Sequence, residues 1–248
     1  MKITIYGWST GQRSPCWQAM GRQDRLPGME LIARGRDADV FALDESRVLR
    51  RYRHEGRPTD LESRLMTHLA ACGYPVPKVY EVTDTDMVLE RLTGPTLQEA
   101  LARRPWRVRD LGRMLGGLHD RLHGLSAPAW LPKRFGTAGD DRVLHLDLHP
   151  GNVILTGRGP VVIDWSNAGA GDPAADVAMT MVTVGSADVP GLAARLGRGL
   201  LLRAVQGGCG TDPTPRVQEA VNAKLADPNL TITEAAWLRN RAAVSAGP

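Results

Sequence analysis

The chain has 248 residues, and its 42% hydrophobic content is enough to bury a core in one large domain or in two smaller ones. Its 31 Lys and Arg side chains against 27 Asp and Glu side chains give a net charge of only +4, too small to indicate nucleic-acid binding unless it clusters. Arginines do gather in RVLRRYRHEGR and RRPWRVR, but aromatic residues do not interleave there to stack on bases. We therefore expect no nucleic-acid partner.

The cysteine content and the hydropathy of the chain indicate where in the cell the protein is located. Cys16, Cys72 and Cys209 are odd in number and far apart, which fits neither a disulfide framework nor a CxxC metal site. No stretch approaches the roughly 18 apolar residues of a membrane span, and the first residues lack the apolar segment of a signal peptide. These features predict a cytoplasmic protein without a membrane partner.

The first part of the chain predicts a small α+β lobe. Residues 1–28 are polar and broken by Gly and Pro, so we expect a poorly ordered leader. Three short strand candidates follow in 29–53, a helix with regularly spaced leucines in 59–73, and two more strands in 74–92. The pattern indicates about five strands and one helix.

The remainder of the chain is mostly helical. Apolar residues recur at helical spacing over 111–122, and short strands are predicted at 152–156 and 160–165, with helices from there onward. The boundary between the two parts falls near residues 91–94, and a crevice between two lobes is the default place for a ligand.

A polar segment, HLDLHPGN, lies at residues 145–152 in the second part. Asp147 and Asn152 are separated by five positions, and Asp164 closes the strand VVIDW. Phosphoryl transfer needs such a set: one carboxylate to take the proton of the acceptor hydroxyl, and an amide and a second carboxylate to hold Mg²⁺. The alternation of His145, Asp147 and His149 leaves a metal cluster open as well.

The segments HLDLHPGNVIL and VVIDWSNAGAGDPAADVA resemble the catalytic region of the aminoglycoside phosphotransferase family. The resemblance extends more weakly from about residue 29 to the C-terminus. It implies an α+β, two-lobed protein-kinase-like fold, with a small antiparallel-sheet N-lobe containing one helix and a larger, mostly helical C-lobe. Residues 29–94 would form the nucleotide-binding lobe and hinge, and residues 95–248 the catalytic and acceptor-binding lobe.

The resemblance assigns roles to the polar residues of the second part. Asp147 would be the catalytic base, and Asn152 and Asp164 would be the magnesium ligands. His145 would support the loop, and Asp176 resembles the helix aspartate that anchors the backbone of the catalytic loop.

In the first part, Val48 and Arg50 alternate as the apolar residue and the lysine of a kinase third strand do, so Arg50 is the candidate for phosphate binding. Glu62, on the following helix, is its predicted ion-pair partner. The spacing of Thr59 and Glu62 also fits a capping box, which would explain the glutamate without any catalytic role.

Three further positions complete the predicted nucleotide site. Gly35 precedes two strands, where a loop would cover the phosphates, and the backbone groups of Glu90 and Leu92 would meet the adenine edge.

His149 is predicted to stabilise its loop rather than to bind a metal, because neutral imidazole suits zinc better than Mg²⁺. His119 and His123 lie four apart on a helix without the glutamate of an HExxH motif, so we expect ordinary packing or surface histidines.

These expectations describe an enzyme that moves the γ-phosphoryl group of ATP or GTP to a hydroxyl of a small acceptor, depends on Mg²⁺, and acts as a monomer. Two alternatives stay open: a metal-dependent hydrolase using His145, Asp147, His149 and Asp164, and a degenerate nucleotide-binding module. Acidic residues are sparse and interleaved with Lys and Arg over residues 186–248, so an acceptor less basic than an aminoglycoside is predicted.

Overall fold

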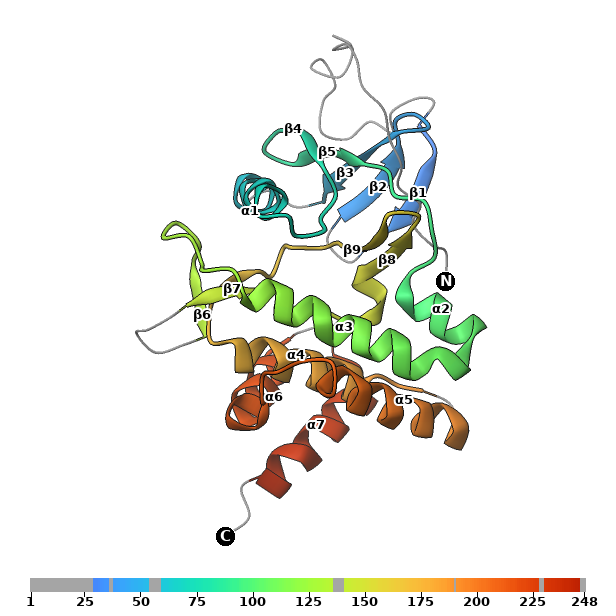
Figure 1. Ribbon diagram of the computed structural model, residues 1–248, viewed down its shortest axis with the longest axis vertical. Helices are drawn as coiled ribbons and strands as arrows, with labels where there is room; N and C mark the ends of the chain where they lie inside the picture. The colour runs from blue at the N-terminus through green and yellow to red at the C-terminus, as the bar shows by residue number, and fades with distance from the viewer. Residues whose placement is uncertain are drawn as a thin grey trace. The chain divides into compact units, whose positions relative to one another are not determined.

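An antiparallel sheet of five strands and one helix make up the first part of the chain (Figure 1). The computed structural model describes residues 29–35, 38–53, 59–135, 141–189, 191–227 and 230–245, so the leader predicted at 1–28 lies outside the described residues. The strand order is β1-β2-β3-β5-β4. The elements are β1 Leu31–Arg34, β2 Ala38–Ala42, β3 Arg47–Tyr52, α1 Thr59–Ala71, β4 Val79–Val82 and β5 Asp86–Glu90. The predicted five strands and one helix are confirmed.

Strand β3 lies at the centre of this sheet, between β2 and β5. Its register pairs Val48 with Leu89 and Arg50 with Met87. Because side chains alternate along a strand, Val48, Arg50 and Tyr52 share one face. Val48 and Met87 are fully buried, so this strand presents Arg50 from a rigid, well-packed position.

Helices dominate the second part of the chain. The apolar face of α3 is buried through Leu111, Leu115, Leu118 and Leu122, which matches the predicted spacing. The helical elements are α2 Leu97–Arg103, η2 Pro105–Arg107, α3 Val108–His123, η3 Pro150–Asn152, α4 Pro173–Ser186, α5 Gly191–Gln206, η4 Thr214–Arg216, α6 Val217–Leu225 and α7 Ile232–Ser245.

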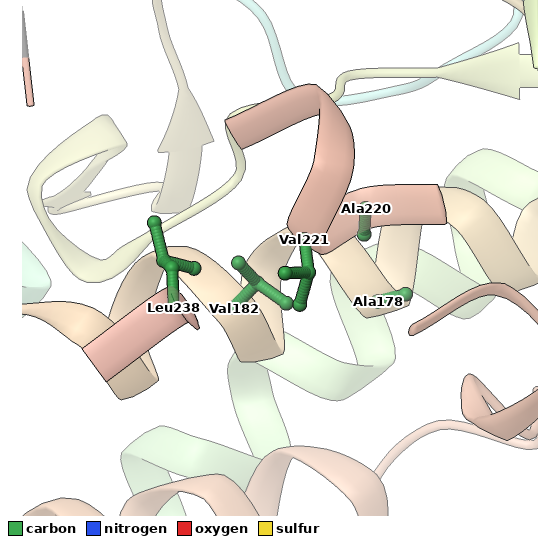
Figure 2. Close-up of a cluster of buried hydrophobic side chains, with 5 residues drawn as sticks. All are labelled: Ala178, Val182, Ala220, Val221 and Leu238. Carbon is green, nitrogen blue, oxygen red and sulfur yellow. The ribbon is translucent and has the colours of Figure 1, made fainter. Parts of the chain in front are cut away.

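Three of these helices share an apolar cluster, shown in Figure 2. Ala178 and Val182 of α4 pack with Ala220 and Val221 of α6 and with Leu238 of α7. All five side chains are buried. Burial of these apolar side chains holds α4, the helix that carries Asp176, against α6 and α7.

A second, smaller sheet was not predicted. Its order is β6-β10-β7, from strands β6 Lys133–Phe135, β7 Arg142–Leu144 and β10 Gly169–Gly171. Each strand has three residues, too few for an alternating pattern to be visible in sequence. A Cβ at Gly171 would lie 1.5 Å from the Phe135 carbonyl oxygen, so the glycine permits a close backbone approach.

The predicted strands around residues 152–165 form a hairpin, β8 Val153–Thr156 and β9 Gly159–Val162. Contacts divide the chain into two units: residues 1–96 with 154–166, and residues 97–153 with 167–248. The chain therefore returns to the first unit for the segment that contains Asp164. In the described residues no helix is both long and apolar enough to cross a membrane.

Candidate functional site

Arg50 joins two carboxylates in the first unit. Its Nη1 donates to Glu62 Oε1 at 2.6 Å, and its Nη2 donates to Asp164 Oδ1 at 2.7 Å. The predicted ion pair between Arg50 and Glu62 is therefore confirmed. A planar guanidinium can contact two separate acceptors in this way, whereas a single ammonium group presents one charge centre.

Glu62 organises the groups around this arginine. Its Oε1 also accepts the backbone N–H of Trp165 at 3.0 Å, and its Oε2 accepts the hydroxyl of Tyr52. The capping-box alternative is not supported, because Glu62 directs its carboxylate to these donors and to Arg50 instead of back to the N–H of Thr59. The buried carboxylate of Glu62 is thus satisfied by three donors.

Tyr52 was not predicted to belong to this group. The guanidinium carbon of Arg50 lies 4.9 Å from the centre of the Tyr52 ring, in cation–π contact. Burial raises the pKa of the Tyr52 phenol far above its usual value, so the hydroxyl remains a donor to Glu62. Its position two residues after Arg50, on the same strand face, is the sequence signal that would have identified it.

Asp164 is placed by an unusual backbone conformation. Its φ is 65°, in the left-handed region that residues with a side chain seldom adopt. One oxygen accepts from Arg50 and from the Ser166 hydroxyl at 3.0 Å. The side chain is 43% exposed, so the carboxylate is presented to solvent by a strained turn directly after β9.

The other residues predicted to contact the nucleotide are Gly35, Glu90 and Leu92, and some of their polar groups already have partners within the protein. Gly35 donates its N–H to the carbonyl oxygen of Ala38, the first residue of β2, at 2.9 Å. The N–H of Glu90 is donated to Lys78 O at 2.9 Å, and its carboxylate binds Arg158. Leu92 is buried. The N–H of Glu90 is therefore already used within the first unit.

The polar loop of the second unit brings Asp147 and Asn152 together. The Asn152 amide Nδ2 donates to Asp147 O at 2.9 Å, and its N–H donates to His149 O at 2.8 Å across the short helix η3. His149 Nδ1 accepts the N–H of Gly151 at 3.0 Å, which confirms its predicted loop-stabilising role. The amide oxygen of Asn152 is the group that this arrangement leaves for a cation.

Asp176 anchors the start of the same loop, as predicted. It accepts the backbone N–H groups of His145 at 3.1 Å and Leu146 at 2.6 Å. His145 is fully buried and its Nδ1 accepts the N–H of Asp147 at 3.3 Å, so it supports the loop as expected. These contacts use ring nitrogens of His145 and His149 that a zinc cluster in the loop would require.

His119 and His123 are buried rather than exposed, so of the two predicted roles packing holds and a surface position is wrong. His123 Nε2 lies 3.0 Å from Asp176 Oδ2 and His119 Nδ1 lies 3.4 Å from it. The three side chains lie close enough together to hold a metal ion, but both oxygens of Asp176 already accept backbone N–H groups. Their arrangement fits a hydrogen-bonded anchor for the loop better than a metal centre.

The predicted site residues thus fall into two groups that the structure describes separately. Arg50, Glu62 and Asp164 meet in the first unit, and Asp147 and Asn152 meet in the second. The first group pairs a cation with carboxylates at the end of a strand, and the second presents a carboxylate and an amide on a braced turn. These are the components of a phosphotransferase.

Comparison with known proteins agrees with this class. The sequence pattern of the phosphotransferase enzyme family matches residues 28–138 and 125–209, and the chain belongs to that family. The predicted resemblance is therefore confirmed, and so is the α+β, protein-kinase-like fold.

Solved structures share this fold at low sequence identity. The streptomycin–ATP–APH(2")-IIa ternary complex superposes with a TM-score of 0.58 at 15% identity, over 86% of this chain and 88% of that one. A choline/ethanolamine kinase family protein from Mesorhizobium loti gives 0.55 at 21% identity, over 87% and 86%.

One curated relative is a probable bifunctional tRNA threonylcarbamoyladenosine biosynthesis protein of Methanospirillum hungatei. It is 33% identical over 98 residues, which are 35% of this chain and 18% of the relative. The chain thus spans less than a fifth of that protein's length.

Proposed function

We propose that this protein transfers the γ-phosphoryl group of ATP, or of GTP, to a hydroxyl group of a small molecule. The observation that carries the proposal is the pair of contacts from Arg50 to Glu62 and Asp164. In kinase-like enzymes the phosphate-binding cation of the third strand pairs with a helix glutamate, and the aspartate after a later strand holds Mg²⁺. Family membership supports phosphoryl transfer, and the ATP complex among the similar structures supports ATP as the donor.

The proposed metal ligands fit Mg²⁺. Asp164 offers a partly exposed carboxylate, and Asn152 offers an amide oxygen whose nitrogen is already donated to Asp147 O. Mg²⁺ prefers such hard oxygen ligands, and one or two protein oxygens suffice when phosphates complete the shell. When bound, the ion would neutralise charge on the transferred group and its leaving oxygen.

Asp147 would act on the acceptor. Its carboxylate would orient the hydroxyl and accept its proton while the acceptor oxygen forms a bond to the γ-phosphorus and the bond to the bridging oxygen breaks. The nucleoside diphosphate leaves with that oxygen. Asp147 suits this role because its backbone is hydrogen-bonded on both sides while its side chain is only partly buried.

The acceptor is proposed to be neutral or weakly charged. Three carboxylates in the C-terminal half of the chain already pair with cations, which a polycation would have to displace. Arg216 binds Asp172 and Glu219, each at 2.9 Å, and Lys224 binds Asp227 at 3.3 Å. An aminoglycoside would need clustered, uncommitted carboxylates.

Nucleotide consumption in the presence of a panel of alcohols, amino alcohols and aminoglycosides tests the proposal. We expect Mg²⁺-dependent, acceptor-dependent turnover that is lost in Asp147→Asn. Turnover with Zn²⁺ alone and no nucleotide would instead favour the hydrolase, and nucleotide binding without turnover would favour a degenerate binding module. The cytoplasmic location and the monomeric state remain predictions, which fractionation and light scattering would test.

A further inference from the structure

A buried chain of hydrogen bonds leads from α3 to the loop that carries Asp147. His119 Nε2 lies 2.9 Å from the hydroxyl oxygen of Thr180 on α4, and that hydroxyl donates to Leu148 O at 2.7 Å. His119 and Leu148 are fully buried and Thr180 is 1% exposed. Polar groups so completely removed from water are costly unless paired.

The direction of these hydrogen bonds follows from their chemistry. The carbonyl of Leu148 can only accept, so the single hydrogen of the Thr180 hydroxyl is directed to it. The hydroxyl must then accept from His119, which requires the hydrogen of the imidazole on Nε2. Burial lowers the pKa of His119 below its usual value, and its other ring nitrogen, Nδ1, lies 3.4 Å from Asp176 Oδ2.

The chain of hydrogen bonds ends immediately beside the proposed base. On the N-terminal side of Asp147, Asp176 holds the N–H groups of His145 and Leu146. Leu146 adopts a φ of 63°, a conformation that persists only where its surroundings enforce it. Asp176 therefore fixes the loop before the base but makes no contact after it among the hydrogen bonds of the described residues.

Leu148 O is the corresponding point after the base. Without a donor at this carbonyl, the peptide between Leu148 and His149 could rotate while Asp176 still held the residues before Asp147. The hydroxyl of Thr180 prevents this rotation, and His119 fixes the orientation of the hydroxyl. The backbone is thereby hydrogen-bonded to α4 on both sides of Asp147, by Asp176 before it and by Thr180 after it, and α3 orients Thr180 through His119.

We propose that His119 and Thr180 are positioning residues that hold the carboxylate of Asp147 in place through the carbonyl of Leu148. The proposal rests on the proposed function, in which Asp147 takes the proton of the acceptor. Neither residue touches the reactants. Misplacement of a catalytic group by about 1 Å costs as much as roughly 100-fold in rate, so loss of this anchor should lower turnover without altering nucleotide binding.

The test compares Thr180→Val with Thr183→Val. Both variants replace a hydroxyl by a methyl group on α4, but the hydroxyl of Thr183 is buried without a hydrogen-bond partner in the described part of the chain. We expect Thr180→Val to lower kcat by roughly 10- to 100-fold with the nucleotide KM unchanged, and Thr183→Val to leave both constants unchanged. Thr180→Ser, which keeps the hydroxyl, should restore most of the activity. Equal kcat values for Thr180→Val and Thr183→Val would overturn the proposal.

Hydrogen exchange provides a readout that does not depend on activity. Amides in residues 144–152 should exchange faster in Thr180→Val and in His119→Phe than in the unmodified protein, while Thr183→Val should keep its protection. If the unmodified protein consumed no nucleotide with any acceptor, the proposed function would fail, but this comparison would still decide whether the anchor exists. Unchanged loop exchange in Thr180→Val would refute the anchor even if the enzyme is active.

Discussion

Arg50 illustrates how one side chain can link two acidic residues that are distant in sequence. Two of its nitrogens bind Glu62 and Asp164, while Arg51, which follows it, faces away and binds both oxygens of Asp86. The two arginines are therefore a matched pair on one strand, one in the proposed phosphate site and one outside it.

For Arg50→Lys we expect the Kd of the nucleotide to rise roughly tenfold, a loss of about 1.4 kcal/mol, because a compact ammonium cannot maintain both contacts. Arg51→Lys is the control and should leave the affinity unchanged. Calorimetric titration with Mg²⁺ and nucleotide measures both. Equal affinities for the two variants would remove Arg50 from the phosphate site.

Asp147 is the residue whose loss should affect chemistry and little else. Asp147→Asn keeps the size of the side chain but cannot accept the proton of a hydroxyl, so kcat should fall by roughly 10²–10⁴-fold, the range expected for loss of a positioned base. Asp141→Asn, which removes a carboxylate paired with Lys133 at 2.6 Å, is the control. Full activity in the Asp147 variant would exclude it as the base.

At the scale of elements, the close contact of α3 with α5 depends on glycine. A Cβ at Gly116 would lie 2.2 Å from Val205 O of α5, whereas a Cβ at Gly117 would have nothing within 4 Å. Gly116 therefore faces α5, whereas Gly117, the next residue of the same helix, faces open space.

Gly116→Ala should lower the free energy of unfolding by about 1–3 kcal/mol, because the added methyl group overlaps a backbone carbonyl and forces the helices apart. Gly117→Ala should instead raise it by about 0.5–1 kcal/mol, because alanine costs less entropy in a helix. Urea unfolding of both variants measures the difference. The same change in both would show that the α3–α5 contact does not need glycine.

Buried ionisable groups govern the whole molecule's response to acid. Burial disfavours the charge on Asp176, but its contacts with His119 and His123 outweigh this and hold its pKa well below 3.8. Burial also holds the pKa of His119 below 6.5, against the attraction of Asp176. In both cases the unfolded chain takes up a proton at a higher pH than the folded protein does.

The free energy of unfolding should therefore fall as the pH is lowered, first below about 6.5 as unfolded His119 binds a proton and again below about 3.8 as unfolded Asp176 does. Urea unfolding from about pH 7.5 to about pH 3 measures it. His119→Gln should remove the first decline and keep the second. A free energy that is constant between pH 7 and pH 5 in the unmodified protein would contradict the prediction.

Much of the fold and part of the site follow from the sequence alone. The five strands and the helix of the first unit are marked by turns and by periodic apolar residues, and the spacing of Asp147, Asn152 and Asp164 is local enough to be recognised. The short strands β6, β7 and β10 escaped prediction because three residues carry no period. The leucine spacing of α3 predicted which face is buried, but not that His119 and His123 lie on that face.

Only the tertiary structure decided which distant residues meet. Arg50 binds Asp164 across more than a hundred positions, because folding brings β3 together with the segment that follows β9, and so long a separation carries no signal in the sequence. Residues of α3 and α4 likewise form hydrogen bonds beside the loop that carries Asp147, although they are distant from one another in sequence. Sequence determines the residue types that chemistry requires, whereas hydrogen bonds between separate elements depend on packing, which local periodicity does not encode.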